Sequence, residues 1–175
     1  MAKPAPDGIT TRVAGPEDAA VIAGLVLAGF ASWDWADDWT PSSSDAEEVE
    51  IAEWLAQPGV WCLLATAGDV PAGQTTLSPA YDIEKEPREE IPGLCHLRHL
   101  FLAPEWHGTG LAAHLLDAAM DHARAVGYAG ARLWTPRDNA RARAFYTREG
   151  WRENGVVREA NRFGMPLIQM VRELG

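Results

Sequence analysis

The sequence has few of the features that mark secreted or membrane-spanning proteins. It contains only two cysteines, Cys62 and Cys95, each isolated in an apolar, strand-like segment. We expect a third strand between their strands, which places the thiols ~10 Å apart, too far for a disulfide, as suits a reducing cytoplasm. The longest run without a charged residue, 19–33, is too short to cross a bilayer. No basic leader precedes it, so we expect no targeting segment and a cytoplasmic location.

Positive charge is scarce in the first half of the chain. Residues 1–95 contain four Lys and Arg against 17 Asp and Glu, whereas residues 96–175 contain 11 Arg against eight acids. The net charge of the whole chain is −10. The acidic half would repel a polyanion, which argues against nucleic acid as a partner. Two explanations stay open: an acidic surface for solubility, or a division in which one half meets a cation and the other an anion.

The length of 175 residues, 47% of them hydrophobic, favours a single domain over residues 9–173 after a loose N-terminus at 1–8. In the first half we expect a strand at 9–13, a helix from 16, a second helix from a Ser44–Glu47 capping box to 58, and strands at 60–67 and 71–77 joined by a turn. A long loop is expected at 78–93. The second half should contain a strand at 95–102, a helix to 126, a strand at 131–135, a helix at 139–148, and strands at 151–158 and 167–172. This order predicts an α/β fold with a mixed, largely antiparallel central sheet of six to seven strands and about four helices on both faces.

Gly108-Thr109-Gly110 stands directly before an apolar helical pattern. The segment 108–113 matches the dinucleotide pattern G-x-G-x-x-A, but no strand leads straight into it and no acid ends the next predicted strand. A turn without function is a second interpretation. A phosphate-binding helix N-terminus is the third, because the first amides of a helix lack internal partners and glycines let the backbone approach an anion.

Two groups of residues could suggest a metal ion. On a regular strand, His96 and His99 point to opposite faces, and Cys95 and His99 lie about 13 Å apart, so no single ion joins them. His114, Asp117 and Asp121 share one helix face, a pattern more typical of a solvated face with i, i+4 pairs. We therefore expect no metal.

The segments "LFLAPEWHGTGLAAHLL" and "NARARAFYTREGW" resemble the GCN5-related N-acetyltransferase (GNAT) family. The first matches its Gln/Arg-x-x-Gly-x-Gly/Ala loop with His107, Gly110 and Ala112, and the second its Asn-x-x-Ala-x-x-Phe-Tyr helix, which begins at Asn139. The departures are His107 for Gln or Arg, and Trp151 for Phe. The resemblance implies the GNAT fold, acetyl-CoA as co-substrate, and acetyl transfer to a primary amine.

By this resemblance, the backbone of Leu100–Leu102 meets the pantetheine arm, and the amides of Gly108–Ala112 bind the pyrophosphate. The implied cofactor-binding residues are Leu100, Phe101, Leu102, His107, Gly108, Thr109, Gly110, Leu111, Ala112, Asn139, Ala142 and Tyr146. Plain core packing of the two leucines and a helix N-cap role for Asn139 are the alternatives.

Two catalytic residues are expected, Tyr146 and His96. The resemblance implies that Tyr146 protonates the departing CoA thiolate, whereas an aromatic residue at this helical position otherwise indicates core packing. An alkylammonium has a pKa near ~10.4, so only about one in 2,500 is a nucleophile at pH 7 and a base must take its proton. His96 occupies the strand position of the base in some family members, and a packed strand histidine is the alternative. Glu105, His99 and Asp34 are other candidates for the base.

The acceptor site is expected in the segment "WDWADDW" (Trp33 to Trp39), together with the acidic loop around Glu84 to Glu90. By the resemblance, the region after the first helix commonly borders the acceptor in GNAT-like proteins. Aromatic faces and carboxylates both attract an ammonium, so Trp33, Trp35, Asp37 and Asp38 would bind a cationic small-molecule or peptide amine. The alternative is a connection whose tryptophans fill the core. A non-catalytic acyl-CoA-binding regulatory module remains the second functional hypothesis. We expect no nucleic acid or membrane partner, and a homodimer is left open.

Overall fold

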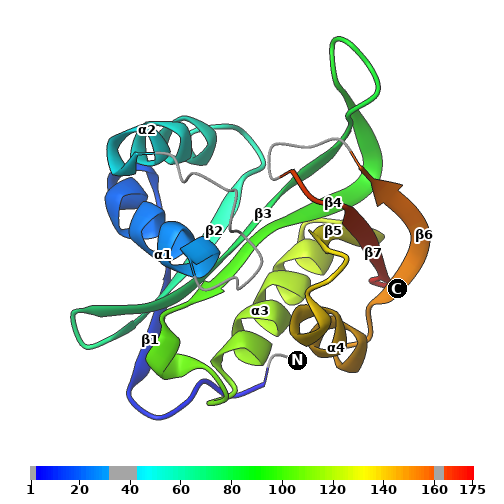
Figure 1. Cartoon of the computed structure of the whole chain (residues 1–175). Coiled ribbons are helices and arrows are strands. Elements are labelled where there is room, and N and C mark those ends of the chain that lie inside the picture. Colours follow the sequence, from blue (N-terminus) through cyan, green and yellow to red (C-terminus); the bar gives the residue numbers. More distant parts are fainter. Residues whose placement is uncertain (1–2, 32–42, 160–163) are drawn as a thin grey trace.

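The computed structural model describes residues 3–31, 43–159 and 164–175, which form one sheet with helices on both faces (Figure 1). The strands are β1 (Ile9–Val13), β2 (Trp61–Ala67), β3 (Val70–Asp82), β4 (Glu89–Leu102), β5 (Gly130–Pro136), β6 (Arg152–Arg158) and β7 (Leu167–Glu173). The helices are α1 (Ala19–Ala31), α2 (Ser44–Leu55), α3 (Leu111–Ala125) and α4 (Ala140–Arg148), with short 3-10 turns η1 (Pro16–Asp18) and η2 (Pro104–Trp106). None of the helices in these ranges is both long and apolar enough to span a bilayer.

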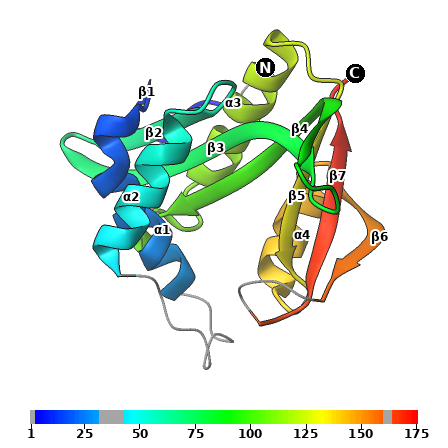
Figure 2. The same cartoon turned by 90° about the horizontal axis from the view of Figure 1, so that it is seen from above.

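The strands follow the order β1-β2-β3-β4-β5-β7-β6, and every neighbouring pair is antiparallel except β4 and β5. The predicted mixed, largely antiparallel sheet is therefore confirmed. The parallel ladder between β4 and β5 has only three residue pairs, and the last of them is His96 opposite Arg132. Figure 2 shows β5, β7 and β6 turned away from β1–β4. We call the separation of β4 and β5 beyond the His96–Arg132 pair the β4–β5 fork.

Helices α1 and α2 cover one face of the sheet, where α1 lies over β3 and β4 and shares a buried cluster with β2. Ile22 and Val26 of α1 are fully buried in one cluster with Cys62 and Leu64 of β2. Gly29 lets α1 approach β4, because a Cβ at this position would lie 2.1 Å from Cδ1 of Phe101. This helix pair therefore rests directly on the strand that borders the fork.

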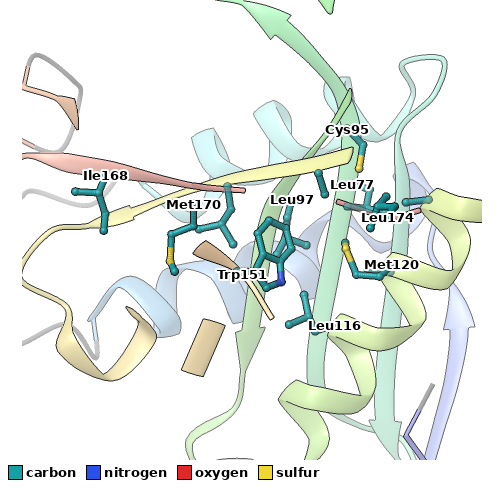
Figure 3. Close-up of a cluster of buried hydrophobic side chains, with 13 residues drawn as sticks. Leu77, Cys95, Leu97, Leu116, Met120, Trp151, Ile168, Met170 and Leu174 are labelled. Carbon is teal, nitrogen blue, oxygen red and sulfur yellow. The ribbon is translucent and has the colours of Figure 1, made fainter. Parts of the chain in front are cut away.

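Helices α3 and α4 lie on the opposite face (Figure 1). Leu116 and Met120 of α3 share a buried cluster with Cys95 of β4, and Trp151, 2% exposed, lies at its centre (Figure 3). Cys95 therefore faces α3 whereas Cys62 faces α1 and α2. Both cysteines are buried and free, as the sequence predicts.

Two local predictions are wrong. The segment 78–93 is no long loop, because β3 continues to Asp82 and β4 begins at Glu89, which leaves only 83–88 as the connection. The N-cap of α2 is Ser43, whose Oγ accepts a hydrogen bond from the Ala46 amide at 3.2 Å, and the predicted box starting at Ser44 is displaced by one residue. The α2 error concerns exposed residues, where hydrophobic periodicity gives little information, whereas Ser78–Ala80 belong to a continuously buried stretch of β3 that shows no alternation.

Candidate active site

The loop before α3 presents unused backbone donors. Gly108 and Gly110 adopt φ angles of +78° and +93°, which favour glycine. Within the described parts of the chain, the amides of Gly108, Gly110, Ala112 and Ala113 make no hydrogen bond. A Cβ added at Gly108 or Gly110 would meet no atom within 4 Å, so the space before these amides is open. Open amides at the positive end of a helix dipole form a binding site for an anion.

Thr109 fixes the shape of this loop. Its hydroxyl donates to the Trp106 carbonyl at 2.7 Å and accepts a longer hydrogen bond, 3.4 Å, from the Leu111 amide. The side chain of His107 is exposed and lies just before the two glycines. The loop is thus held by its own residues while the donors around it stay available.

Helix α4 positions Asn139 and Tyr146 on one face. Asn139 is the N-cap, and its Oδ1 accepts a hydrogen bond from the Ala142 amide at 3.0 Å, which confirms the capping role. The cap uses only the oxygen, so the side-chain NH₂ remains a donor. Tyr146 follows two turns later and packs edge-on against Phe145 and Trp151. Burial raises the pKa of the Tyr146 phenol, so it is protonated at neutral pH.

The end of β4 borders the fork with its backbone. Beyond His96, this strand has β3 on one side and no paired residue of β5 on the other. Leu102 and the partly buried Leu100 pack into the cluster beneath α3, whereas Phe101 packs beneath α1. The core-packing interpretation of the two leucines is confirmed, and it leaves their backbone groups on the fork side for another partner.

A β-bulge near Arg98 changes the direction of His99. The pairing passes from Thr76 opposite His99 to Leu77 opposite Leu97, with an irregularity between them. The ring of His99 lies 5.4 Å from that of Trp54 on α2. Because His96 alternates with Cys95 and Leu97, which face α3, both histidines lie on the α1/α2 face. The prediction that they point to opposite faces is therefore wrong.

His96 lies at the base of the fork. Among the described residues, its buried Nδ1 has no hydrogen-bond partner. Desolvation, and then the positive charges of Arg132 and Arg98, lower the pKa of His96 to about 3. The imidazole is thus neutral at pH 7 and a weak base in the free protein. The other suggested bases are Glu105, which is exposed in η2, and Asp34, which falls outside the described residues.

The residues once considered for a metal make other contacts. Nδ1 of His114 meets the Lys3 carbonyl at 2.6 Å, Asp117 accepts from the Lys3 amide at 3.2 Å, and Asp121 pairs with Arg124. The Lys3 ammonium also pairs with Glu149, beside α4. In the described ranges, no three His, Cys, Asp or Glu side chains are grouped closely enough to bind an ion.

The predicted acceptor residues Trp33, Trp35, Asp37 and Asp38 lie outside the described residues. Their segment connects the end of α1 with the start of α2, the two helices on the His96 face. Sequence reasoning did not single out Arg132, which lies beside His96 on the neighbouring strand. The available signal was its place as the one charged residue in the apolar strand pattern "ARLWT".

Comparison with known proteins agrees with this geometry. The family model described as the acetyltransferase (GNAT) family matches residues 29–151. The chain therefore belongs to the GNAT family of acetyltransferases. An uncharacterized N-acetyltransferase of Archaeoglobus fulgidus is 38% identical over 56 residues, which is 32% of this chain. The match spans 38% of the length of that curated relative.

Solved structures share the fold over nearly the whole chain. A GNAT-family acetyltransferase from Desulfovibrio desulfuricans has a TM-score of 0.74 and 23% identity, covering 95% of this chain and 99% of that one. The PaiA N-acetyltransferase of Thermoplasma acidophilum, solved in complex with coenzyme A, has a TM-score of 0.62 and 20% identity, covering 94% of this chain and 98% of that one.

Proposed function

We propose that this protein transfers the acetyl group of acetyl-CoA directly to a primary amine. The open amides before α3 carry this proposal, because they provide an anion site for the pyrophosphate at one end of a fork that can hold the pantetheine arm. Membership of the GNAT family, whose enzymes use acetyl-CoA, and the PaiA complex with coenzyme A support the choice of cofactor.

In the proposed reaction, the amine nitrogen attacks the thioester carbonyl carbon and forms a tetrahedral intermediate. The C–S bond then breaks as Tyr146 donates its phenolic proton to the leaving thiolate. Asn139 and the amides of residues 108–112 hold the cofactor on the α3/α4 side of the sheet. Tyr146 and His96 lie on opposite faces of the sheet. This arrangement suits a thiolate that leaves on one face and an amine that arrives from the other.

The low pKa of His96 limits which proton this residue can accept during the reaction. Moving a proton from an ammonium of pKa near ~10.4 to a group of pKa about 3 costs on the order of 10 kcal/mol. Losing that proton to water at pH 7 costs about 4.6 kcal/mol. The acceptor, drawn to the protein as a cation, therefore loses its proton to solvent before the attack, and His96 takes the more acidic proton of the tetrahedral intermediate.

The test of the cofactor site uses two matched glycines. Gly110 and Gly127 have φ angles of +93° and +95°, and a Cβ at either position meets nothing within 4 Å. Gly110→Ala and Gly127→Ala should therefore lower the melting temperature similarly through backbone strain. Only Gly110→Ala should weaken coenzyme A binding, by about tenfold or more, because its methyl group and strained backbone disturb the open amides.

Calorimetric titration with coenzyme A measures this difference, and NAD and ATP serve as comparison ligands. Coenzyme A should raise the melting temperature of the native protein, whereas NAD and ATP should change it little. An unchanged dissociation constant for coenzyme A in a folded Gly110→Ala protein would contradict the cofactor site.

For the acceptor, we propose a small-molecule or peptide amine drawn to the protein as a cation. The motivation is the segment 33–39, with three tryptophans and three aspartates, in the acidic half of the chain. The roles of Trp33, Trp35, Asp37 and Asp38 remain predictions, because they lie outside the described residues.

A second candidate is an acyl-CoA-binding module without turnover. The low pKa of His96 favours it, because a group that resists protonation is a poor acceptor of the amine proton. Steady release of coenzyme A from acetyl-CoA with a panel of amines separates the two. Binding of coenzyme A with no release for any amine would support the module.

A further inference from the structure

Arg132 is a buried cation at the base of the fork. It is 8% exposed and lies on β5 directly opposite His96 in the last pair of the parallel ladder. Ala131 and Leu133, on either side of it, face the α3 cluster. Since side chains alternate along a strand, Arg132 faces the other side, the one that carries His96.

The guanidinium of Arg132 is poorly satisfied by the protein itself. Its one hydrogen bond with the described residues runs from Nη2 to the Tyr81 carbonyl at 2.6 Å, although a guanidinium has five N–H donors. Among the described residues, its buried Nε has no partner. The Asp82 carboxylate attracts the guanidinium without forming an ion pair with it. By contrast, Arg98 on the same face has Glu50 at 4.0 Å. A desolvated cation that no carboxylate contacts directly is costly, so a bound anion would stabilise it.

The position of Arg132 relates this anion to the acceptor. The cofactor loop before α3 and the helix with Tyr146 occupy one face of the sheet, so a second substrate reaches the fork from the other face. The backbones of Arg132 and His96 are adjacent, with the strands about 4.8 Å apart, and the positive charge of Arg132 acts on the His96 imidazole. A group bound at Arg132 would therefore lie near an amine held beside His96.

We propose that Arg132 binds a carboxylate of the acceptor, so that the substrate is an amine that also carries a carboxylate group. This inference rests on the proposed acetyltransferase function and narrows its substrate class. A guanidinium matches a carboxylate with two parallel hydrogen bonds, which favours this anion.

A structural role is the competing explanation, because the hydrogen bond to Tyr81 joins β5 to the far end of β3. Loss of this bond would affect every acceptor alike. A carboxylate site affects only acceptors that have the carboxylate. The test therefore compares matched pairs of ligands in native and variant proteins.

The experiment measures dissociation constants of acceptors by calorimetry in the presence of coenzyme A, which requires no turnover. The ligands are linear amino acids of two to six carbons, each paired with the amine that lacks the carboxylate. The variants are Arg132→Gln and the control Arg172→Gln, which removes another arginine with a buried nitrogen that has no partner among the described residues. Arg172 pairs with Ala131 and therefore lies on the α3 side of the sheet.

In the native protein, at least one amino acid should bind about 10- to 100-fold more tightly than its paired amine, the range expected for hydrogen bonds to a charged group. Arg132→Gln should abolish this preference, and Arg172→Gln should keep it. No preference in any pair, or equal weakening of both members by Arg132→Gln, overturns the inference.

Release of coenzyme A from acetyl-CoA with the same pairs tests the underlying function separately. Turnover that is indifferent to the carboxylate would leave the acetyltransferase proposal standing and reject the role of Arg132. A carboxylate preference in binding without any turnover would keep Arg132 as a binding residue and reject the acetyltransferase proposal.

Discussion

The two faces of the sheet differ in what they bury beside the fork. On the α3/α4 side, the buried cluster is formed by apolar residues such as Leu116, Met120 and Trp151, and the anion site consists of backbone amides. On the α1/α2 side, buried polar side chains follow the strands across the sheet. These are Gln74, Thr76 and Ser78 of β3 and Arg132 of β5, and the half-buried His96 of β4 lies between them.

This difference matches the two tasks that we assign to the faces. A backbone site binds phosphate groups that every acyl-CoA shares, so it needs glycines and a helix end but no particular side chain. A side-chain site distinguishes one acceptor from another, because its buried polar groups must be satisfied by that acceptor. The α1/α2 face should therefore determine the specificity of this protein.

The largest expected effect comes from removing the phenol on the cofactor side. Tyr146→Phe should lower the turnover number by about 10²- to 10⁴-fold, the usual range for a general acid, and leave coenzyme A affinity nearly unchanged. Turnover numbers and calorimetric titrations measure the two quantities. Tyr128→Phe is the matched control, because Tyr128 also packs against the α3 cluster and burial likewise raises the pKa of its phenol.

Equal losses of turnover in the two variants would show that packing, rather than proton donation, explains the result for Tyr146. The cofactor face would then contribute binding alone. The α3/α4 face would then have no catalytic residue in our proposal, and only the anion site before α3 would remain.

The sequence predicted the cofactor face better than the acceptor face, for a physical reason. The Gly108–Ala112 loop and the Asn139–Tyr146 helix are local motifs, so each carries its function within a few consecutive residues. The His96–Arg132 pair joins two strands 36 positions apart, and only the register of the sheet brings them together. The bulge near Arg98 also reverses the face of His99, and no periodicity in the sequence indicates it.

The error at 78–93 has a similar origin. Glu89 and Glu90 are exposed and belong to a strand because their backbone pairs with Asp82 and Tyr81. A strand without a buried face has no alternation to detect. The strong predictions therefore concern segments that bury side chains, such as β2 and α3, and the weak ones concern segments held by backbone pairing.

A smaller effect is expected from His96 in the pH dependence of stability. The pKa of His96 is about 3 in the folded protein and about 6.5 in an unfolded chain. Between these values the unfolded chain binds the additional proton, so stability is complete above about pH 6.5 and decreases as the pH falls toward 3. The maximum slope from this residue is about 1.4 kcal/mol per pH unit.

His96→Gln should remove this part of the slope in urea unfolding measured between pH 4 and 7. His107→Gln, which replaces an exposed histidine, is the control. A slope that is unchanged in His96→Gln would mean that His96 is hydrated and basic in the folded state. The α1/α2 face would then be more hydrated than we propose, and His96 would be a stronger base.

The smallest expected effect tests the acidic segment between α1 and α2. If Asp37 and Asp38 attract the ammonium of the acceptor, Asp37→Asn/Asp38→Asn should raise the Michaelis constant of the acceptor several-fold, because exposed charge pairs contribute only about 0.2–1 kcal/mol each. The Michaelis constant of acetyl-CoA should not change.

Added salt should raise the Michaelis constant of the acceptor in the native protein, since the Debye length falls from about 10 Å at 0.1 M to about 3 Å at 1 M. Steady-state kinetics at both salt concentrations measure this, with Asp7→Asn/Asp69→Asn, which changes two exposed aspartates before β1 and in the β2–β3 turn, as the charge-matched control. An acceptor constant indifferent both to salt and to the aspartate change would leave Arg132 as the charged group we propose for acceptor recognition.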